Sequence, residues 1–325
     1  MDDLLAGDGT GTRVAGVMVS GTLVVDGGQR LLRARRHIVV LFVANLVLGW
    51  FAAFGLSSRI GAVTGPSLIS EQLLRGFDLG TFLELINKPE IAPASQAPLG
   101  LVFSGIFVVL QLFLTGGIIT QYLAAEPIDR GRFYAACGEN FWKMVRIAVL
   151  IAVITALVAG VFYAFRAALQ AALKAEGSRA FIVQSAVLLI EALALLWIRM
   201  WFDVAQAQLV STGAPRVRSS VAYGFRSMRG AIGLFASYVL LAVLMFLGAA
   251  LGVFLWWTAA PASQAVVSFL ILQSTLAWLL ALRWWQRALA ADWHQRKRQV
   301  AITIESRLLQ ELPPESAVPE APLSQ

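Results

Sequence analysis

Glu191 is the ionisable side chain whose position most strongly suggests chemistry. It lies near the middle of an apolar run at 181–202. At the centre of a membrane helix an Asp, Lys or Arg costs about 2.5–3.5 kcal/mol to insert, so ionisable residues there often belong to proton relays or solute paths. Glu191 is therefore a candidate proton carrier.

Glu191 belongs to a candidate intramembrane polar cluster. Gln184 lies seven residues earlier on the same helix face, and Asn45, Gln111 and Gln273 lie at a similar depth in other apolar runs. One interpretation is a path for protons or a solute across the membrane. The other is hydrogen bonding between helices, which contributes about 0.6 kcal/mol per bond on average. We favour the second, because one carboxylate without a second titratable partner makes a poor relay.

Templates of known active sites are not found in the sequence. The two histidines, His37 and His294, lie at predicted cytoplasmic membrane edges, so we expect no intramembrane Ser–His pair. The chain contains no His-Glu-x-x-His, no Cys-x-x-Cys and no P-loop. Asp203 is predicted to meet Arg199, four residues earlier on the same helix face. We therefore expect that the protein is not an enzyme, that it has no catalytic residue, and that it binds no metal or other cofactor.

The elements that must position these residues are six apolar runs. A spanning helix needs about 20 apolar residues, and the lipid interior requires such runs to be helical. The sequence predicts an all-α fold, a polytopic transmembrane helix bundle of six spans that can be arranged as three in–out–in hairpins, within a membrane domain at 26–290. The runs lie at 38–55, 99–123, 145–166, 181–202, 231–257 and 264–285.

The composition supports this class. Hydrophobic residues make up 58% of the chain and charged residues 14%, whereas soluble domains average about 45–50% and about 25%. The formal net charge is +7, but the basic residues cluster at the ends of apolar runs. That pattern favours anionic lipid headgroups over nucleic acid as the partner. The single Cys137 excludes an intrachain disulfide.

The basic residues also predict the orientation. Most of the 26 Lys and Arg residues fall in the segments on one side of the six runs. By the positive-inside rule this side is the cytoplasm, so the sequence predicts a protein of the inner membrane with both termini in the cytoplasm. Candidate contacts to lipid headgroups are Arg30, Arg33, Arg35, Arg36, Lys143, Arg146, Arg226 and Arg229.

These cations belong to three stretches that each begin with Gly and lead into a span: 28–36, 138–146 and 224–229. They form either a weak internal repeat or an independent result of the same topological bias. Each is expected to lie along the inner headgroups before it turns into the membrane.

Small residues in the spans predict close helix contacts. Gly116-Gly117 is consistent with a hinge, a half-helix break or a tight crossing, of which packing is favoured. Two ridges of small residues, one at Ala152, Ala156 and Gly160 and one at Gly248 and Gly252, are also predicted to pack against other helices.

Three segments lie outside the spans. Residues 1–25 are predicted to be flexible, and residues 56–98 to form an extracytoplasmic loop with short amphipathic helices at 67–75 and 79–87. Residues 291–325 are predicted to be a cytoplasmic tail, helical to Leu312 and disordered at its Pro- and Glu-rich end.

The residues that carry a resemblance to a known group are Trp201–Val210, Val221-Ala222 and Phe225-Arg226 between the fourth and fifth runs, with Leu114–Gly117 and Phe133–Trp142. In these residues the chain resembles a group of uncharacterised bacterial six-span inner-membrane proteins. These are similar to the membrane domain found beside glycerophosphodiester phosphodiesterases. The resemblance covers roughly 110–250. It implies a bacterial inner membrane and no catalytic residue, because the catalytic domain of those enzymes is not in this sequence.

The functional expectation is a multi-pass inner-membrane protein without a catalytic site, acting as a scaffold or accessory subunit. Its expected partners are anionic lipids and either another membrane protein or a second copy of the chain. Two alternatives stay open: a small transporter or channel subunit that uses the cluster around Glu191, and lipid handling at the inner leaflet.

Overall fold

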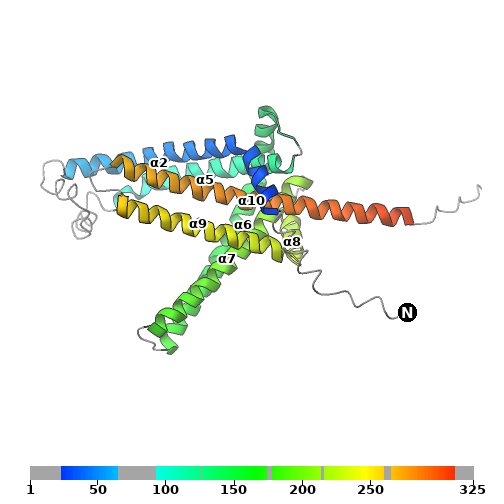
Figure 1. Cartoon of the computed structure of the whole chain (residues 1–325). Helices are drawn as coiled ribbons and strands as arrows, with labels where there is room; N and C mark the ends of the chain where they lie inside the picture. Colours follow the sequence, from blue (N-terminus) through cyan, green and yellow to red (C-terminus); the bar gives the residue numbers. More distant parts are fainter. Residues whose placement is uncertain are drawn as a thin grey trace, which may run out of the picture.

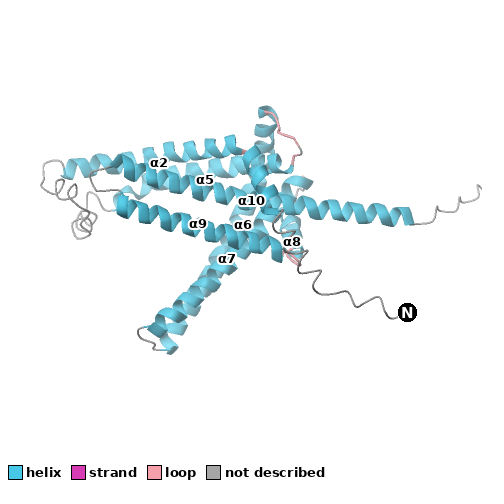
Figure 2. Ribbon diagram, viewed as in Figure 1, coloured by secondary structure: helices cyan, strands magenta, loops and turns pink. Residues whose placement is uncertain are grey.

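The computed structural model describes residues 23–64, 93–124, 126–173, 178–213, 216–259 and 265–311, and these ranges contain helices and no β-strand (Figure 2). Six helices are long and apolar enough to cross a membrane. The predicted all-α fold with six spans is confirmed, and it is consistent with a multi-pass membrane protein. The six are α2 (Arg35–Thr64), α5 (Pro93–Leu123), α6 (Arg130–Leu173), α7 (Ser178–Thr212), α9 (Ile232–Ala259) and α10 (Ala265–Glu311).

The helices meet in one region, which we call the convergent end, and diverge from it as two arms, while the C-terminal half of α10 continues past this region on the other side (Figure 1). Helices α2, α5, α9 and α10 run together as the first arm, whereas α6 and α7 form the second, the α6–α7 arm. Consecutive spans contact each other as the predicted hairpins: α2 with α5, α6 with α7, and α9 with α10.

The buried core lies at the convergent end. On α6 the buried side chains fall between Phe133 and Ile147, and no described side chain beyond Ile147 is buried. On α7 all buried positions except Val187 fall between Met200 and Leu209. The remaining surfaces of both arms are apolar and exposed, as expected for helices that face lipid tails.

Glycine allows the closest helix approach in this core. A Cβ added at Gly117 of α5 would lie 2.4 Å from Sγ of Cys137 on α6, and one at Gly116 would lie 2.9 Å from Cβ of Asn140. Helix α5 continues without a break through both positions. Of the three interpretations of Gly116-Gly117, the structure therefore supports the tight crossing.

The two predicted ridges of small residues differ. A Cβ added at Gly248 or Gly252 of α9 would lie 2.2 Å from Trp278 or Thr275 of α10, so this contact is confirmed. At Gly160 of α6 no atom lies within 4 Å of such a Cβ. The prediction for the ridge at Ala152, Ala156 and Gly160 is therefore wrong for contacts within the described chain, and all three residues are exposed.

Several helices extend beyond the ranges predicted for the spans. Asp129 accepts a hydrogen bond of 2.7 Å from the backbone N–H of Arg132, a capping contact that starts α6 well before the predicted span. The helix then runs unbroken through 138–146, so the prediction of a separate interfacial stretch there is wrong. The other two basic stretches are separate helices: residues 23–33 precede a turn at Ala34, and α8 (Val217–Ser227) precedes the turn at 228–230.

The loops and ends also differ from expectation. Helix α2 continues to Thr64 and α5 begins at Pro93, so only 65–92 of the predicted loop can lie between them. The predicted helices at 67–75 and 79–87 fall outside the described residues, as do 1–22 and 312–325. Residues 23–25, predicted to be flexible, are helical, and the predicted tail helix is the continuation of α10.

Candidate functional site

The most enclosed charge at the convergent end is the carboxylate of Asp203 on α7, whose side chain is 2% exposed. Arg283 of α10 donates two hydrogen bonds to it, Nη1 to Oδ2 at 2.6 Å and Nη2 to Oδ1 at 2.8 Å. Nε of Arg287, one turn further along α10, lies 3.7 Å from Oδ1. The two-pronged contact of Arg283 is the strong geometry for a guanidinium–carboxylate pair.

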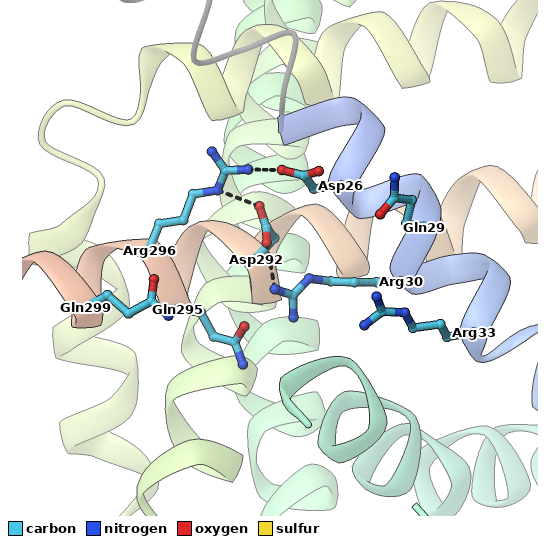
Figure 3. Close-up of a pocket in the computed structure, with 8 residues that line it drawn as sticks. All are labelled: Asp26, Gln29, Arg30, Arg33, Asp292, Gln295, Arg296 and Gln299. Carbon is cyan, nitrogen blue, oxygen red and sulfur yellow. Dashed lines mark hydrogen bonds and ion pairs between the residues drawn. The ribbon is translucent and has the colours of Figure 1, made fainter. Parts of the chain in front are cut away.

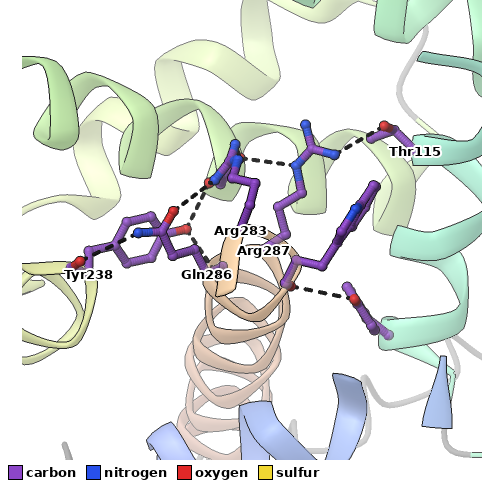
Figure 4. A network of polar contacts seen from close by, with 8 residues as sticks. Thr115, Tyr238, Arg283, Gln286 and Arg287 are labelled. Atoms are coloured by element: carbon purple, nitrogen blue, oxygen red, sulfur yellow. Dashed lines mark hydrogen bonds and ion pairs between the residues drawn. The ribbon is translucent and has the colours of Figure 1, made fainter. Parts of the chain in front are cut away.

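Further contacts extend this pair across four helices (Figure 4). The hydroxyl of Tyr238 on α9 lies 2.9 Å from Oδ2 of Asp203 and 2.8 Å from the carbonyl of Gln286. Arg287 donates to the hydroxyl of Thr115 on α5 at 3.2 Å. We call these residues the Asp203 network. It joins α5, α7, α9 and α10 at the point where the arms meet.

The charges in this network do not balance, since the guanidinium groups of Arg283 and Arg287 face one carboxylate. Their side chains are only 13% and 12% exposed. Arg287 gains a further contact, because its guanidinium carbon lies 4.4 Å from the centre of the Trp284 ring, an attractive cation–π geometry. The network is thus built from mutual contacts in the core, which suits a joint between helices.

A second polar site lies where the helical segment 23–33 crosses α10 (Figure 3). It surrounds a recess of about 280 Å³. Asp292 is its centre: Nη2 of Arg30 lies 2.7 Å from one carboxylate oxygen, and Nε of Arg296 lies 2.8 Å from the other. Arg296 also pairs with Asp26. The recess is lined by Asp26, Gln29, Arg30, Arg33, Asp292, Gln295, Arg296 and Gln299.

The same site closes the end of α5. Arg30 donates to the carbonyl of Tyr122, and Gln295 donates to the carbonyl of Leu123 at 2.5 Å. The last carbonyls of a helix have no partner within it, so these contacts satisfy groups that would otherwise lack one. Ion pairs thus join the segment 23–33 to α10, and hydrogen bonds from both of these elements hold the end of α5.

Glu191, the leading candidate from the sequence, has an ionic partner that sequence reasoning missed. Nη2 of Arg166 on α6 lies 3.2 Å from Oε2 of Glu191 on α7. The two side chains are 23% and 12% exposed. The pair joins the two helices of the α6–α7 arm, away from the convergent end.

The remaining members of the predicted polar cluster are dispersed. Asn45 borders a recess of about 180 Å³ between α2 and α5, whereas Gln184 is exposed on α7. Gln111 of α5 and Gln273 of α10 are half-buried. No hydrogen bond or ion pair joins any two of these five side chains in the part of the chain that the structure describes.

The predicted headgroup contacts all lie at the convergent end, but two of them have protein partners. Arg30 pairs with Asp292, as described above, and Lys143 donates to the carbonyl of Gly213 at 3.3 Å. The other six are exposed: Arg33, Arg35, Arg36, Arg146, Arg226 and Arg229.

The structure brings one serine against a histidine, which the sequence did not lead us to expect. Oγ of Ser211 lies 3.0 Å from Nε2 of His294 and donates to the carbonyl of Gln208. His294 is 1% exposed and its Nδ1 has no hydrogen-bond partner among the described residues. This is the geometry of a packed core contact.

The ionic partner predicted for Asp203 from the sequence was wrong. The expected partner, Arg199, forms no ion pair with it among the described residues, and two arginines of another helix take its place. A signal was available: Arg283 and Arg287 are four residues apart at the end of an apolar run, so they share one face of a helix at membrane depth. Sequence alone does not say which acid meets them.

Among the described residues, no group of three or more His, Cys, Asp or Glu side chains could hold a metal ion. No protein-family model matches the chain, and no curated protein or solved structure matches it. The resemblance to bacterial six-span proteins therefore stays a prediction.

Proposed function

We propose that the chain is a multi-pass protein of the bacterial inner membrane that acts without catalysis, as a scaffold or accessory subunit of a membrane process. In this proposal the convergent end faces the cytoplasm. The Asp203 network is the observation that carries it. The most enclosed charges of the described chain contact one another and join four helices, as a structural joint requires.

The arms supply the surfaces that such a role needs. The joint holds the α6–α7 arm away from the other helices (Figure 1), and its apolar side chains stay exposed. Leu157, for example, is 67% exposed on α6, next to the unpartnered ridge of Ala152, Ala156 and Gly160. Small residues allow two membrane helices to approach closely. The proposed partner is therefore another membrane protein, or a second copy of the chain, seated on this ridge.

A photo-crosslinking amino acid at Leu157 tests the proposal in native membranes. The expected result is one protein adduct of defined mass at Leu157 and only lipid adducts at Phe246, a position on α9 that is 72% exposed. Ala156→Leu would fill the ridge and should remove the protein adduct. Lipid adducts alone at both positions would overturn the scaffold proposal.

The transporter alternative predicts a different result. Vesicles with the purified protein would show proton- or solute-driven flux that Glu191→Gln abolishes. The scaffold proposal predicts no such flux, because Glu191 is held by Arg166 and the other polar residues are dispersed. Flux that depends on Glu191 would replace our proposal with the transporter.

Lipid handling at the inner leaflet is a second candidate, favoured by one observation. Exposed arginines at the convergent end border a recess with an aromatic wall, formed by α7 and the turn after α8. Accelerated exchange of a labelled phospholipid between the leaflets of vesicles that contain the protein would support it, and exchange at the rate of protein-free vesicles would contradict it.

A further inference from the structure

A recess of about 460 Å³ lies between α7 and the last turn of α8 with the connection that follows it. Its wall is of two kinds. Trp197, Phe225 and Met228 provide aromatic and apolar surface, and Arg226 and Arg229 provide two guanidinium groups. This combination matches a ligand that carries a negative charge next to a hydrocarbon portion.

The two arginines are available to an external anion. Both are exposed, and no carboxylate pairs with either of them in the described ranges. Arg30 and Arg283 differ in this respect, since each contacts an aspartate. A guanidinium presents a planar set of donors that fits phosphate oxygens.

The aromatic side is held in place by α7. Trp197 packs edge-on against Phe235 of α9, with 5.0 Å between ring centres. Trp201 contacts Phe225 at 5.2 Å and donates to the carbonyl of Val221 at 2.8 Å, which fixes α8 against α7. The recess therefore has a preformed apolar wall.

The end of α8, which carries Arg226, and the turn that follows, which carries Arg229, are also fixed. Nζ of Lys297 on α10 donates to the carbonyls of Ser227 at 3.0 Å and Arg229 at 3.4 Å. Gly230 has φ of +80°, a left-handed conformation that glycine adopts at little cost. The chain then enters α9 two residues later.

The level of the recess in the membrane follows from the length of α9. Its 28 residues extend about 42 Å at 1.5 Å per residue, whereas the hydrocarbon core is about 30 Å thick. A helix of this length centred on the core extends about 6 Å past it at each end. Arg229 lies three residues before α9 begins, which places it at the level of the headgroups. Lipid phosphates lie at this level, and tryptophan is enriched there.

We propose that this recess binds one anionic glycerophospholipid. Arg226 and Arg229 hold the phosphodiester, and the upper part of an acyl chain lies along Trp197, Phe225 and Met228. Headgroups without a cation are preferred, because the ammonium of a choline headgroup would lie beside two guanidinium groups. The inference deepens the proposed membrane role through its lipid partner, but it does not depend on the proposed protein partner.

Native mass spectrometry of the purified full-length protein tests this site. Delipidated protein is mixed with equal amounts of phosphatidylglycerol and phosphatidylcholine. We expect one retained phosphatidylglycerol, at least fivefold preferred over phosphatidylcholine. The double variant Arg226→Gln/Arg229→Gln should lose this adduct. The matched control is Arg216→Gln/Arg218→Gln, which removes the same charge from exposed positions at the other end of α8 and should keep it.

Each outcome decides the proposal. Equal retention of both lipids by the unmodified protein, or equal loss in both double variants, would overturn it. If the first double variant does not purify as a monodisperse particle, Arg226→Lys/Arg229→Lys replaces it. That variant keeps the charge but loses the two-pronged donors, so a reduced preference is expected and an unchanged one would contradict the site. If no protein is crosslinked at Leu157 but phosphatidylglycerol is retained, the scaffold proposal is contradicted and the lipid site is not.

Discussion

The carboxylate of Asp203 lies between two largely buried guanidinium groups, so its charge affects more than one contact. Asp203→Asn keeps the shape of the side chain but leaves Arg283 and Arg287 without their counter-ion. Breaking a buried ion pair in this way costs about 3–5 kcal/mol. We expect a free energy of unfolding in detergent reduced by this amount.

The control for Asp203→Asn is Tyr238→Phe, which removes one hydroxyl from the same network. A lost hydrogen bond of this kind costs about 1–3 kcal/mol, so the smaller change is expected. Equal effects of the two substitutions would contradict the importance of charge at this site.

The contact between Arg166 and Glu191 predicts coupled effects. Arg166→Gln and Glu191→Gln should each destabilise the α6–α7 arm, because each leaves the other charge unpaired in apolar surroundings. The double variant should lose less stability than the sum of the two, by about 0.5–3 kcal/mol. Thermal unfolding of the four proteins in one detergent measures this difference, and additive effects would exclude the coupling.

The sequence predicted individual residues better than their partners. Glu191 was recognised because a carboxylate in an apolar run is unusual. Its partner Arg166 was assigned to the outer side only, because the contact depends on how far α6 and α7 continue before the chain reverses. The partners of Asp203 were missed for a related reason. Its nearest cation in the sequence is Arg199, but its contacts come from α10, 80 residues away.

At the scale of helices, the crossing of α5 and α6 depends on the absence of a side chain. Gly117→Leu would place its side chain where Cys137 and Phe133 now lie. Overpacking of this kind costs about 1–3 kcal/mol, and we expect a lower melting temperature in detergent. Gly105→Leu on the same helix is the control, because no atom lies within 4 Å of its added Cβ. Similar melting temperatures for the two variants would contradict a tight crossing.

Hydropathy located the six spans but not the ends of their helices. Apolar runs indicate only the part of a helix that lies in lipid. Helix α10 extends over 47 residues, about 70 Å, because the sequence after Trp293 also favours a helix and contains no proline before 313. Helix α6 passes Gly138 for a similar reason, since one glycine costs only about 1 kcal/mol in a helix.

The orientation of the whole molecule is testable. A green fluorescent protein fused after Gln325 should fluoresce, and alkaline phosphatase inserted between residues 65 and 92 should be active, because we expect those positions on opposite sides of the membrane. An active phosphatase fused after Gln325 would reverse the orientation and place the convergent end outside the cell.

The arrangement of the helices as two arms was not predictable from the sequence. Hydropathy indicates only that each run is long and apolar enough to cross a membrane, and it does not say which of them stay together. The division depends on contacts such as the Asp203 network, which join residues far apart in the chain. The pairing of α9 with α10, by contrast, was predictable, because the connection between these two spans is short.

The divergence of the arms has a mechanical consequence. Since they are joined at one end, contacts within the described chain leave the separation of the opposite ends unset, and the surrounding lipids must balance it. A thinner or more compressed bilayer would then change the angle between the arms while each helix stays intact. The angle between the two arms would therefore depend on the thickness of the membrane.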